Sequence, residues 1–283
     1  MPWPKIIATE DSHRGWRETF VQNDNPIWHA VELVVFDVDG TLYDQKPLRI
    51  RMMGALILHT LRTGSLETLT VLKHFRRIRE ELGNEGVEHF EKTLLERTSN
   101  QTGSSPEQIA KIVHEWIEIR PLQYLKTCRY PGVKQVFENL RSRGIKIGVF
   151  SDYPASLKLK AMELEPDFVI SAEEPNVGVL KPNPRGLILL MERAQARPTQ
   201  TLMIGDRIDR DGAAAKNAGT LSLIRSPRSI SGWSCFQSYE QPPFTSGSSL
   251  KETPMKNLAV WIILGLMLIS LSLGIVILTV LQR

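Results

Sequence analysis

Apolar residues in this chain occur in short uninterrupted runs and in longer stretches with helical spacing. The short runs are rich in β-branched residues, as is typical of strands buried on both faces of a parallel sheet; they lie at 33–36, 145–150, 168–170, 201–204 and 221–224. Stretches with helical spacing follow them and predict helices at 133–143, 155–163, 182–194 and 211–218. This alternation predicts an α/β fold with a doubly wound parallel sheet.

A long helical region separates the first predicted strand from the second. Apolar positions between residues 45 and 130 have helical spacing, and Gly83 and Gly86 are expected to break one of these helices. Ser105-Pro106-Glu107-Gln108 combines an N-cap serine, a proline at the first helical position and a capping-box glutamine, so another helix begins there. We expect residues 45–130 to be a helical insertion in a core made of residues 31–44 and 131–225.

The regions on either side of this core have a different character. Residues 1–30 contain Trp3, Trp16 and Trp28 and lack the pattern of a signal peptide. We expect this segment to be an arm that packs against the core, and binding of a partner is the alternative. Residues 226–256 are dominated by Ser, Pro, Gly and Gln without an apolar period, which predicts a flexible linker.

Residues 258–281 form an apolar run without a charged side chain. At a rise of about 1.5 Å per residue, a helix of this length exceeds a hydrocarbon core of about 30 Å. The run predicts a single-pass transmembrane anchor over residues 257–283. Lys251 and Lys256 before the run, with the lack of a signal peptide, favour a cytoplasmic catalytic domain. Ser270 and Gly274 are small residues four positions apart, which could let two such helices pair as a homodimer. A monomeric span is the alternative.

Composition narrows the classes of protein. With 283 residues, 42% hydrophobic and 23% charged, the chain has the composition of a globular protein. A net charge of +4 is too small to indicate nucleic-acid binding. Cys128 and Cys235 have no metal-site or disulfide spacing, which favours a reducing compartment.

The candidate chemistry begins where the first predicted strand ends. Asp37 and Asp39 follow the run at 33–36, with Gly40 and Thr41 directly after them. In open α/β folds, ligands bind at the carboxyl ends of the strands. A lone Asp-Gly would predict only a turn, whereas Asp-x-Asp-Gly-Thr after a buried strand is far more specific.

Three further motifs follow later strands or loops. They are Ser151-Asp152, Lys181-Pro182, and Gly205-Asp206 with Asp211. Taken singly, Ser151 could be an ordinary turn serine, Lys181 an exposed lysine before a helix, and Asp206 and Asp211 acids in a loop. Together, and in this order, the four motifs resemble those of the haloacid dehalogenase-like (HAD) superfamily of phosphohydrolases. The resemblance covers roughly residues 31–225 and implies a Rossmann-like core with an α-helical cap over the active site.

This resemblance implies roles for the motif residues. Asp37 would be the nucleophile that forms an aspartyl-phosphate, and Asp39 the general acid and base. In the family, a second acid marks phosphatases and phosphomutases, which disfavours dehalogenase and ATPase activities. Lys181 would be the cation for the phosphoryl group. The residues around the phosphate would be Ser151, Asp152, Gly40 and Thr41.

The acids and the phosphate together require a cation. Asp37, the Asp39 backbone carbonyl and Asp206 match the magnesium ligands of the family, with Asp211 as a supporting acid and Asp209 as its competitor. Oxygen-only ligation of this kind suits Mg²⁺.

The predicted function is a magnesium-dependent phosphatase at the cytoplasmic face of a membrane. Its partner would be a phosphorylated small-molecule or lipid-linked substrate. A phosphomutase would use the same motifs, and a catalytically silent membrane adaptor is the alternative of another class. The basic run at 73–79 fits either a solvated helix face or a contact with anionic lipid or substrate.

Overall fold

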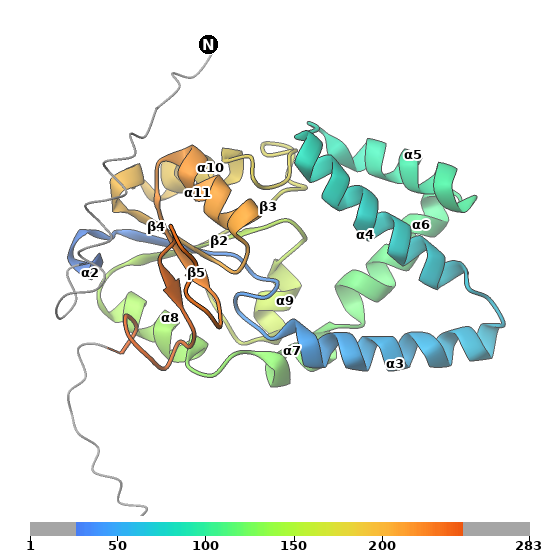
Figure 1. Cartoon of the computed structure of the whole chain (residues 1–283), viewed down its shortest axis with the longest axis horizontal. Coiled ribbons are helices and arrows are strands. Elements are labelled where there is room, and N and C mark those ends of the chain that lie inside the picture. The colour runs from blue at the N-terminus through green and yellow to red at the C-terminus, as the bar shows by residue number, and fades with distance from the viewer. Residues whose placement is uncertain (1–26, 246–283) are drawn as a thin grey trace, which may run out of the picture. The chain divides into compact units, whose positions relative to one another are not determined.

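The computed structural model describes residues 27–245, and residues 1–26 and 246–283 lie outside the described part. Its sheet is parallel and has the order β3-β2-β1-β4-β5-β6, which confirms the predicted parallel sheet (Figure 1). The strands are β1 (Leu33–Phe36), β2 (Lys146–Ser151), β3 (Phe168–Ser171), β4 (Thr201–Gly205), β5 (Leu221–Arg225) and β6 (Cys235–Phe236).

The strand order changes direction at β1, and the site residues follow the strands around this point. The chain runs outward from β1 through β2 to β3, then returns to the other side of β1 as β4. Phe36 of β1 pairs with Val149 of β2 and with Ile204 of β4. The carboxyl ends of the three strands therefore lie level, at the switch point where open α/β sheets bind ligands.

Helices cover both faces of the sheet (Figure 1). Val34 and Phe36 belong to one hydrophobic cluster with residues of α7, α8 and α9, whereas Leu33 and Val35 belong to another with residues of α10 and α11. Successive residues of a strand point to opposite faces, so β1 contributes to both cores. These helices are α7 (Leu122–Cys128), α8 (Val133–Ser142), α9 (Ser156–Ala161), α10 (Arg185–Ala194) and α11 (Ala213–Ala218).

The insertion between β1 and β2 is helical, and its buried apolar residues form a hydrophobic cluster that also includes Ala172 and Leu180 of the core. We call its helices α3 to η1 the cap: α3 (Gln45–Thr63), α4 (Glu67–Glu85), α5 (Phe90–Thr102), α6 (Pro106–Val113) and the π-helix η1 (His114–Ile119). Ser105 and Gln108 form the expected capping box at the start of α6. Two short turns, η2 (Pro198–Gln200) and η3 (Ile208–Gly212), flank β4.

The prediction that Gly83 and Gly86 break a helix of the cap is confirmed for Gly86 and wrong for Gly83. Gly83 lies inside α4, and the helix ends at Gly86, which has φ +66°. A Cβ atom on Gly83 would lie 2.2 Å from the Nη1 atom of Arg210. Glycine at this position lets the guanidinium group approach the helix backbone.

Residues 226–245 pack against the core, so the prediction of a flexible linker is wrong for this segment. β6 pairs with β5, and the buried rings of Phe236, Tyr239 and Phe244 pack together. The Tyr239 hydroxyl donates a hydrogen bond of 3.0 Å to the carbonyl oxygen of Thr41. Irregularly spaced aromatic residues give no periodic signal but still bury a large apolar area. Residues 246–256 of the predicted linker lie outside the described residues.

The start of the described segment also packs against these aromatic residues. Trp28 lies in the short helix α2 (Ile27–Ala30), donates to the Pro243 carbonyl oxygen at 2.8 Å and contacts the ring of Phe244. This is the packing expected of the N-terminal arm, whose Trp3 and Trp16 lie outside the described residues. Between residues 27 and 245, no helix is long and apolar enough to cross a bilayer, and the predicted anchor at 257–283 lies beyond this range.

Candidate active site

Asp37 is buried at the carboxyl end of β1, with both carboxylate oxygens engaged. Its Oδ1 atom accepts a hydrogen bond of 2.6 Å from the Lys181 ammonium, and Oδ2 accepts one of 2.9 Å from the Thr41 hydroxyl. Burial, only partly opposed by Lys181, raises the pKa of Asp37 well above its usual range, and the nearby Asp211 and Asp206 raise it further. Lys181 and Thr41 thus fix the orientation of the Asp37 carboxylate, which lies close to the acids Asp206 and Asp211.

Lys181 is the cation at the centre of this cluster. Its ammonium is buried and lies 2.7 Å from Asp211 Oδ1, in addition to its contact with Asp37. Burial alone would lower the pKa of Lys181, but Asp211 and Asp37 outweigh it and hold that pKa well above the usual value. Lys181 therefore keeps a fixed positive charge beside the predicted nucleophile.

Asp211, and not its competitor Asp209, lies within this cluster. Asp211 Oδ2 accepts the backbone N–H groups of Asp206 and Arg207 at 3.1 and 3.0 Å, so it holds the loop after β4 as well as Lys181. Asp209 is exposed and pairs with Arg207 at 2.7 Å. A difference of two positions within the π-helical segment η3 decides which acid points inward.

The arrangement of the acids fits a divalent cation. Carboxylate oxygens of Asp37, Asp206 and Asp211 lie within 4.8 Å of one another. The Oδ1 atom of Asp206 is buried without a hydrogen-bond partner in the described part of the chain. Burial, with Asp211 as the second cause, raises the pKa of Asp206 to about 6. A buried oxygen without a donor, in a set of oxygen ligands, is what a magnesium site requires.

Gly40 allows the loop after Asp39 to pass directly over these acids. It has φ +103°, and a Cβ atom there would lie 2.2 Å from Asp206 Oδ2. A residue with a side chain would therefore be strained by its backbone and would collide with the carboxylate. Gly40 and Thr41 thus shape the loop, with the Thr41 hydroxyl directed at Asp37.

Ser151 and Asp152 lie at the end of β2, and their side chains already have partners. The Ser151 hydroxyl accepts the Tyr153 N–H at 3.3 Å and stays buried. Asp152 Oδ1 accepts the Lys181 N–H at 3.0 Å. The Asp152 carboxylate therefore holds the Lys181 loop. Since this side chain is occupied, the backbone N–H groups of Asp152 and its neighbours are the part of this motif suited to bind phosphate.

Asp39 is held by two residues that the sequence did not single out. Lys158 of α9 lies 2.7 Å from Oδ1 and 2.8 Å from Oδ2, and the Tyr43 hydroxyl donates to Oδ1. Burial would raise the pKa of Asp39, but Lys158 and the hydrogen bonds outweigh it, so that the pKa falls below its usual value. The weak sequence signal was a lysine within Ser-Leu-Lys-Leu-Lys, next to the Ser151 motif.

Two buried arginines join the cap to the core beside this site. Arg79 of α4 donates to the Asp152 carbonyl oxygen, pairs with Glu173 at 2.9 Å and lies over the Tyr153 ring. Arg210 of η3 donates to the Lys181 carbonyl oxygen at 2.5 Å and to the Glu80 carbonyl oxygen of α4 at 2.8 Å. Cap residues therefore contact the loops that carry Asp152 and Lys181.

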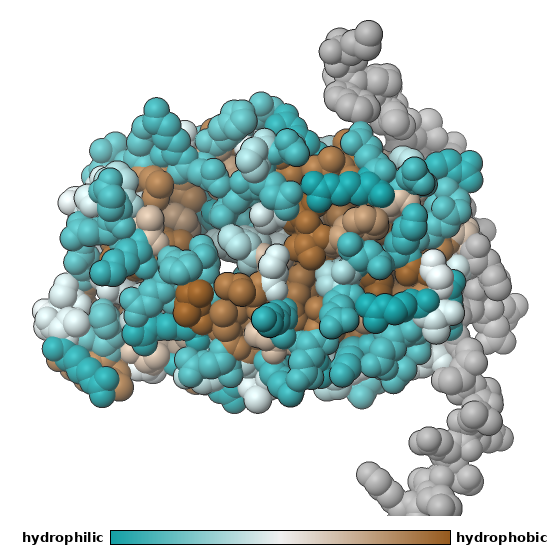
Figure 2. All heavy atoms as spheres, turned by 180° about the vertical axis from the view of Figure 1, so that it is seen from behind, coloured by the Kyte–Doolittle hydropathy of each residue, from teal (hydrophilic) through white to brown (hydrophobic). Residues whose placement is uncertain are grey.

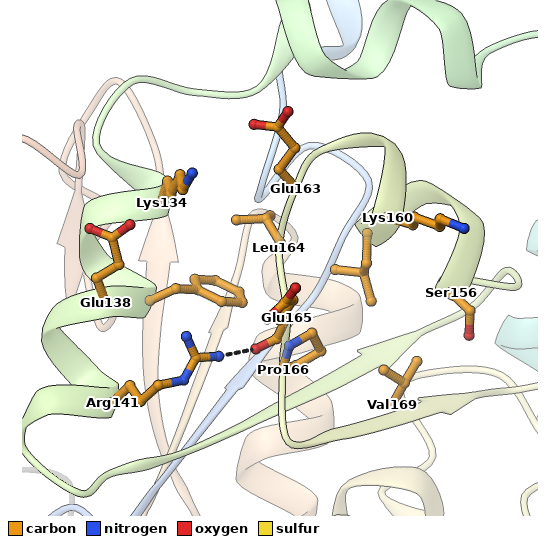
Figure 3. Close-up of a pocket in the computed structure, with 12 residues that line it drawn as sticks. Lys134, Glu138, Arg141, Ser156, Lys160, Glu163, Leu164, Glu165, Pro166 and Val169 are labelled. Atoms are coloured by element: carbon orange, nitrogen blue, oxygen red, sulfur yellow. Dashed lines mark hydrogen bonds between the residues drawn. The ribbon is translucent and has the colours of Figure 1, made fainter.

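A groove of about 530 Å³ lies elsewhere, between α8 and the end of α9 (Figure 3). Its charged lining residues are of both signs, and Arg141 crosses it to donate to the Glu165 carbonyl oxygen at 2.6 Å. None of the predicted catalytic residues lines it. The chemistry is therefore assigned to the strand ends and not to this groove.

Comparison with known proteins agrees with this geometry. The sequence matches the haloacid dehalogenase-like hydrolase family over residues 31–219, which is more than half of the chain. The chain belongs to this family. The matched range contains every residue of the site described above, from Asp37 to Asp211.

Relatives of this hydrolase include several phosphatases. It is 28% identical to the glyceraldehyde 3-phosphate phosphatase of Methanopyrus kandleri over 202 residues, 68% of this chain and 83% of the relative. It is also 28% identical to the phosphoglycolate phosphatase of Vibrio vulnificus, over 68% of this chain and 82% of the relative. These matches support a phosphoric monoester hydrolase.

Solved structures show the same fold. A 2-haloacid dehalogenase from Pseudomonas syringae has a TM-score of 0.54 at 21% identity, covering 75% of this chain and 96% of its own. A HAD-hydrolase from Bacillus subtilis, bound to magnesium, also has a TM-score of 0.54, at 15% identity over 74% of this chain and 96% of its own. At these identities the likeness concerns the fold of the hydrolase alone.

Proposed function

We propose that this hydrolase is a magnesium-dependent phosphatase that acts through an aspartyl-phosphate on Asp37. The observation that carries the proposal is the Asp37 carboxylate, fixed between Lys181 and Thr41 beside a second acid, Asp39. The phosphatase relatives support this class of reaction.

In the first half of the reaction, an Asp37 oxygen attacks phosphorus and the bond to the leaving oxygen breaks. Asp39 gives that oxygen its proton. Lys181 offsets the charge on the phosphoryl group from its fixed position. A magnesium ion held by Asp37 and Asp206 would supply further positive charge at the phosphoryl oxygens.

In the second half, Asp39 removes a proton from water, which attacks the phosphorus and releases phosphate and free Asp37. The contact with Lys158 favours the ionised form of Asp39, which this step needs. The first half needs Asp39 protonated, because the leaving oxygen takes its proton there. Separation of Asp39 from Lys158 when the anionic substrate binds would raise the pKa of Asp39 and allow this.

The proposed substrate is a phosphorylated small molecule. Glyceraldehyde 3-phosphate and phosphoglycolate are the first compounds to test, because relatives are named for them. A lipid-linked phosphate is an alternative that fits the anchor proposed below. A phosphomutase would use the same motif residues, but it would transfer the phosphoryl group to another hydroxyl instead of releasing it.

We also propose that residues 258–281 anchor the phosphatase in a membrane, with the catalytic domain on the cytoplasmic side. The support is the uncharged apolar run itself and the two lysines that precede it. A homodimer through this helix would follow from its small residues.

The test is phosphate release by the purified full chain from a panel of phosphomonoesters, including the two named above and a lipid phosphate. We expect release from at least one compound, loss in EDTA and recovery with Mg²⁺. Full activity in EDTA would rule out the metal-dependent mechanism. Phosphoryl transfer to a sugar without phosphate release would identify a phosphomutase, and no reaction on any compound would favour the adaptor.

A further inference from the structure

The cap helix α3 is apolar on two opposite faces. Leu48 and Leu56 are buried toward the protein. The other face carries an exposed stripe formed by Ile50, Met53, Ile57, Leu58 and Leu61. Their spacing of three and four places these side chains on one side of the helix. Ile50 and Leu61, near its two ends, are 74% and 75% exposed.

Single exposed leucines are common on protein surfaces, but this stripe is a contiguous apolar patch. Leu66 and Leu69, which follow α3 in the sequence, are also exposed. Figure 2, which shows the molecule from behind, has brown apolar patches among hydrophilic residues on the side where the cap lies. Contiguous exposed apolar side chains on a helix are normally covered by a partner or a membrane, so the outer face of α3 calls for a covering surface.

The charges beside the stripe indicate what covers it. α3 contains four exposed basic residues and no Asp or Glu; the basic residues are Lys46, Arg49, Arg51 and Arg62. At 100° per residue, Arg49 lies on one flank of the stripe and Arg62 on the other. Arg51 instead donates to the Thr127 hydroxyl at 2.8 Å and lies over the Tyr124 ring. None of the four forms a salt bridge with an acid among residues 27–245.

We propose that the exposed face of α3 lies on an anionic lipid bilayer, with the stripe in the headgroup region and Arg49 and Arg62 beside lipid phosphates. An apolar stripe with basic flanks is the pattern of a helix that lies in the membrane interface. The proposal rests on the anchor given under Proposed function. Residue 258 follows residue 245 by 13 positions, and a chain of that length reaches about 45 Å at most. The domain is thereby kept near the bilayer, where a weak contact suffices.

The experiment uses the full chain in vesicles of phosphatidylcholine, with or without phosphatidylserine. An NBD fluorophore is placed on Ile57→Cys in a Cys235→Ser background, Cys128 being buried. Leu157→Cys on α9 is the matched control, because Leu157 is 52% exposed and Ile57 is 55% exposed. Doxyl-labelled lipids quench only fluorophores that reach the bilayer. Flotation of the vesicles reports the anchor independently.

We expect strong quenching at position 57 in phosphatidylserine vesicles, weaker quenching in phosphatidylcholine, and none at position 157. Arg49→Gln with Arg62→Gln should lower quenching in phosphatidylserine toward the phosphatidylcholine value. Protein that floats with the vesicles without quenching at position 57 would refute the α3 contact and keep the anchor. Protein that does not float would refute both the anchor and the α3 contact.

A blue shift of the fluorophore at position 57 that grows with protein concentration, without quenching by the lipids, would mean that a second copy of the chain covers the stripe. That outcome would overturn the proposal.

Discussion

The Lys158 ammonium lies 2.7 and 2.8 Å from the two carboxylate oxygens of Asp39, although the residues are 119 positions apart. Both side chains are largely withdrawn from solvent, with 6% and 23% of their surface exposed. At this distance a buried cation strongly favours the ionised carboxylate. Lys158 therefore controls the protonation of the proposed acid and base.

Replacing Lys158 by Met should leave the effect of burial on Asp39 unopposed by this cation, so that the pKa of Asp39 rises. We expect the acid limb of the rate of phosphoenzyme hydrolysis, the step that needs Asp39 ionised, to move to higher pH, and this rate at pH 7 to fall by about 10- to 100-fold, in the range of a general acid–base contribution. Lys160→Met, on the same helix but exposed, is the control. An unchanged profile in Lys158→Met would show that Asp39 does not depend on this contact.

Asp37→Asn should abolish turnover, because an amide cannot form the acyl phosphate. The variant should still fold, as circular dichroism and thermal melting can check. Asp209→Asn makes the same change at an exposed acid outside the cluster and should retain activity. Asp39→Asn should slow both halves of the reaction. With a substrate whose leaving group needs no proton, it should accumulate a phosphoenzyme, which intact-mass spectrometry would detect. Turnover by Asp37→Asn would exclude this nucleophile.

Asp206→Asn should stabilise the metal-free protein at pH 7. The pKa of Asp206 is about 6 in the folded protein and about 3.9 in an unfolded chain. The folded state thus holds the extra proton between these values, and stability is lost as pH rises from about 4 to 6. Removing the carboxylate should recover roughly 1–3 kcal/mol in EDTA at pH 7.

Urea unfolding in EDTA at pH 5 and pH 7 measures this effect. The variant should show a smaller loss of stability between the two pH values than the wild type, and Mg²⁺ should no longer stabilise it. A variant less stable than wild type at pH 7 would show that the Asp206 carboxylate does not destabilise the metal-free site.

Gly83→Ala should weaken the contact between the cap and the core. The new methyl group would lie 2.2 Å from Arg210 Nη1, whose guanidinium also holds the Lys181 carbonyl oxygen. We expect a loss of about 1–3 kcal/mol from overpacking and a higher KM. Gly54→Ala in α3 meets nothing within 4 Å and should gain about 0.5–1 kcal/mol from helix propensity. Equal thermal shifts in the two variants would contradict the role given to Gly83.

A chain that ends at residue 245 should leave the membrane fraction and hydrolyse a small phosphoester, because it keeps the aromatic packing of Phe236, Tyr239 and Phe244. A chain that ends at residue 230 should be less stable, since it loses these rings and the bond to Thr41. Membrane sedimentation and thermal melting of both chains test this. If the 1–245 chain folds but is inactive, residues 246–283 are required for catalysis.

The sequence by itself determined the sheet and the strand ends at which the acids lie. Asp37, Ser151 and Asp206 each follow a run of buried apolar residues, and parallel strands end at a common edge. Local pattern also determined the start of α6, because the capping box involves only neighbouring residues. Such features depend on a few adjacent positions, which is why they could be predicted.

Only the tertiary structure decided which distant side chains complete the site. Lys158 and Arg210 are long side chains that reach their partners across the fold; only a weak local pattern marks Lys158, and none marks Arg210. The choice of Asp211 over Asp209 depends on which way successive side chains of η3 point, and the packing of Tyr239 depends on space beside Thr41. These contacts arise from the folded backbone, which brings together residues whose separation in the sequence carries no periodic signal.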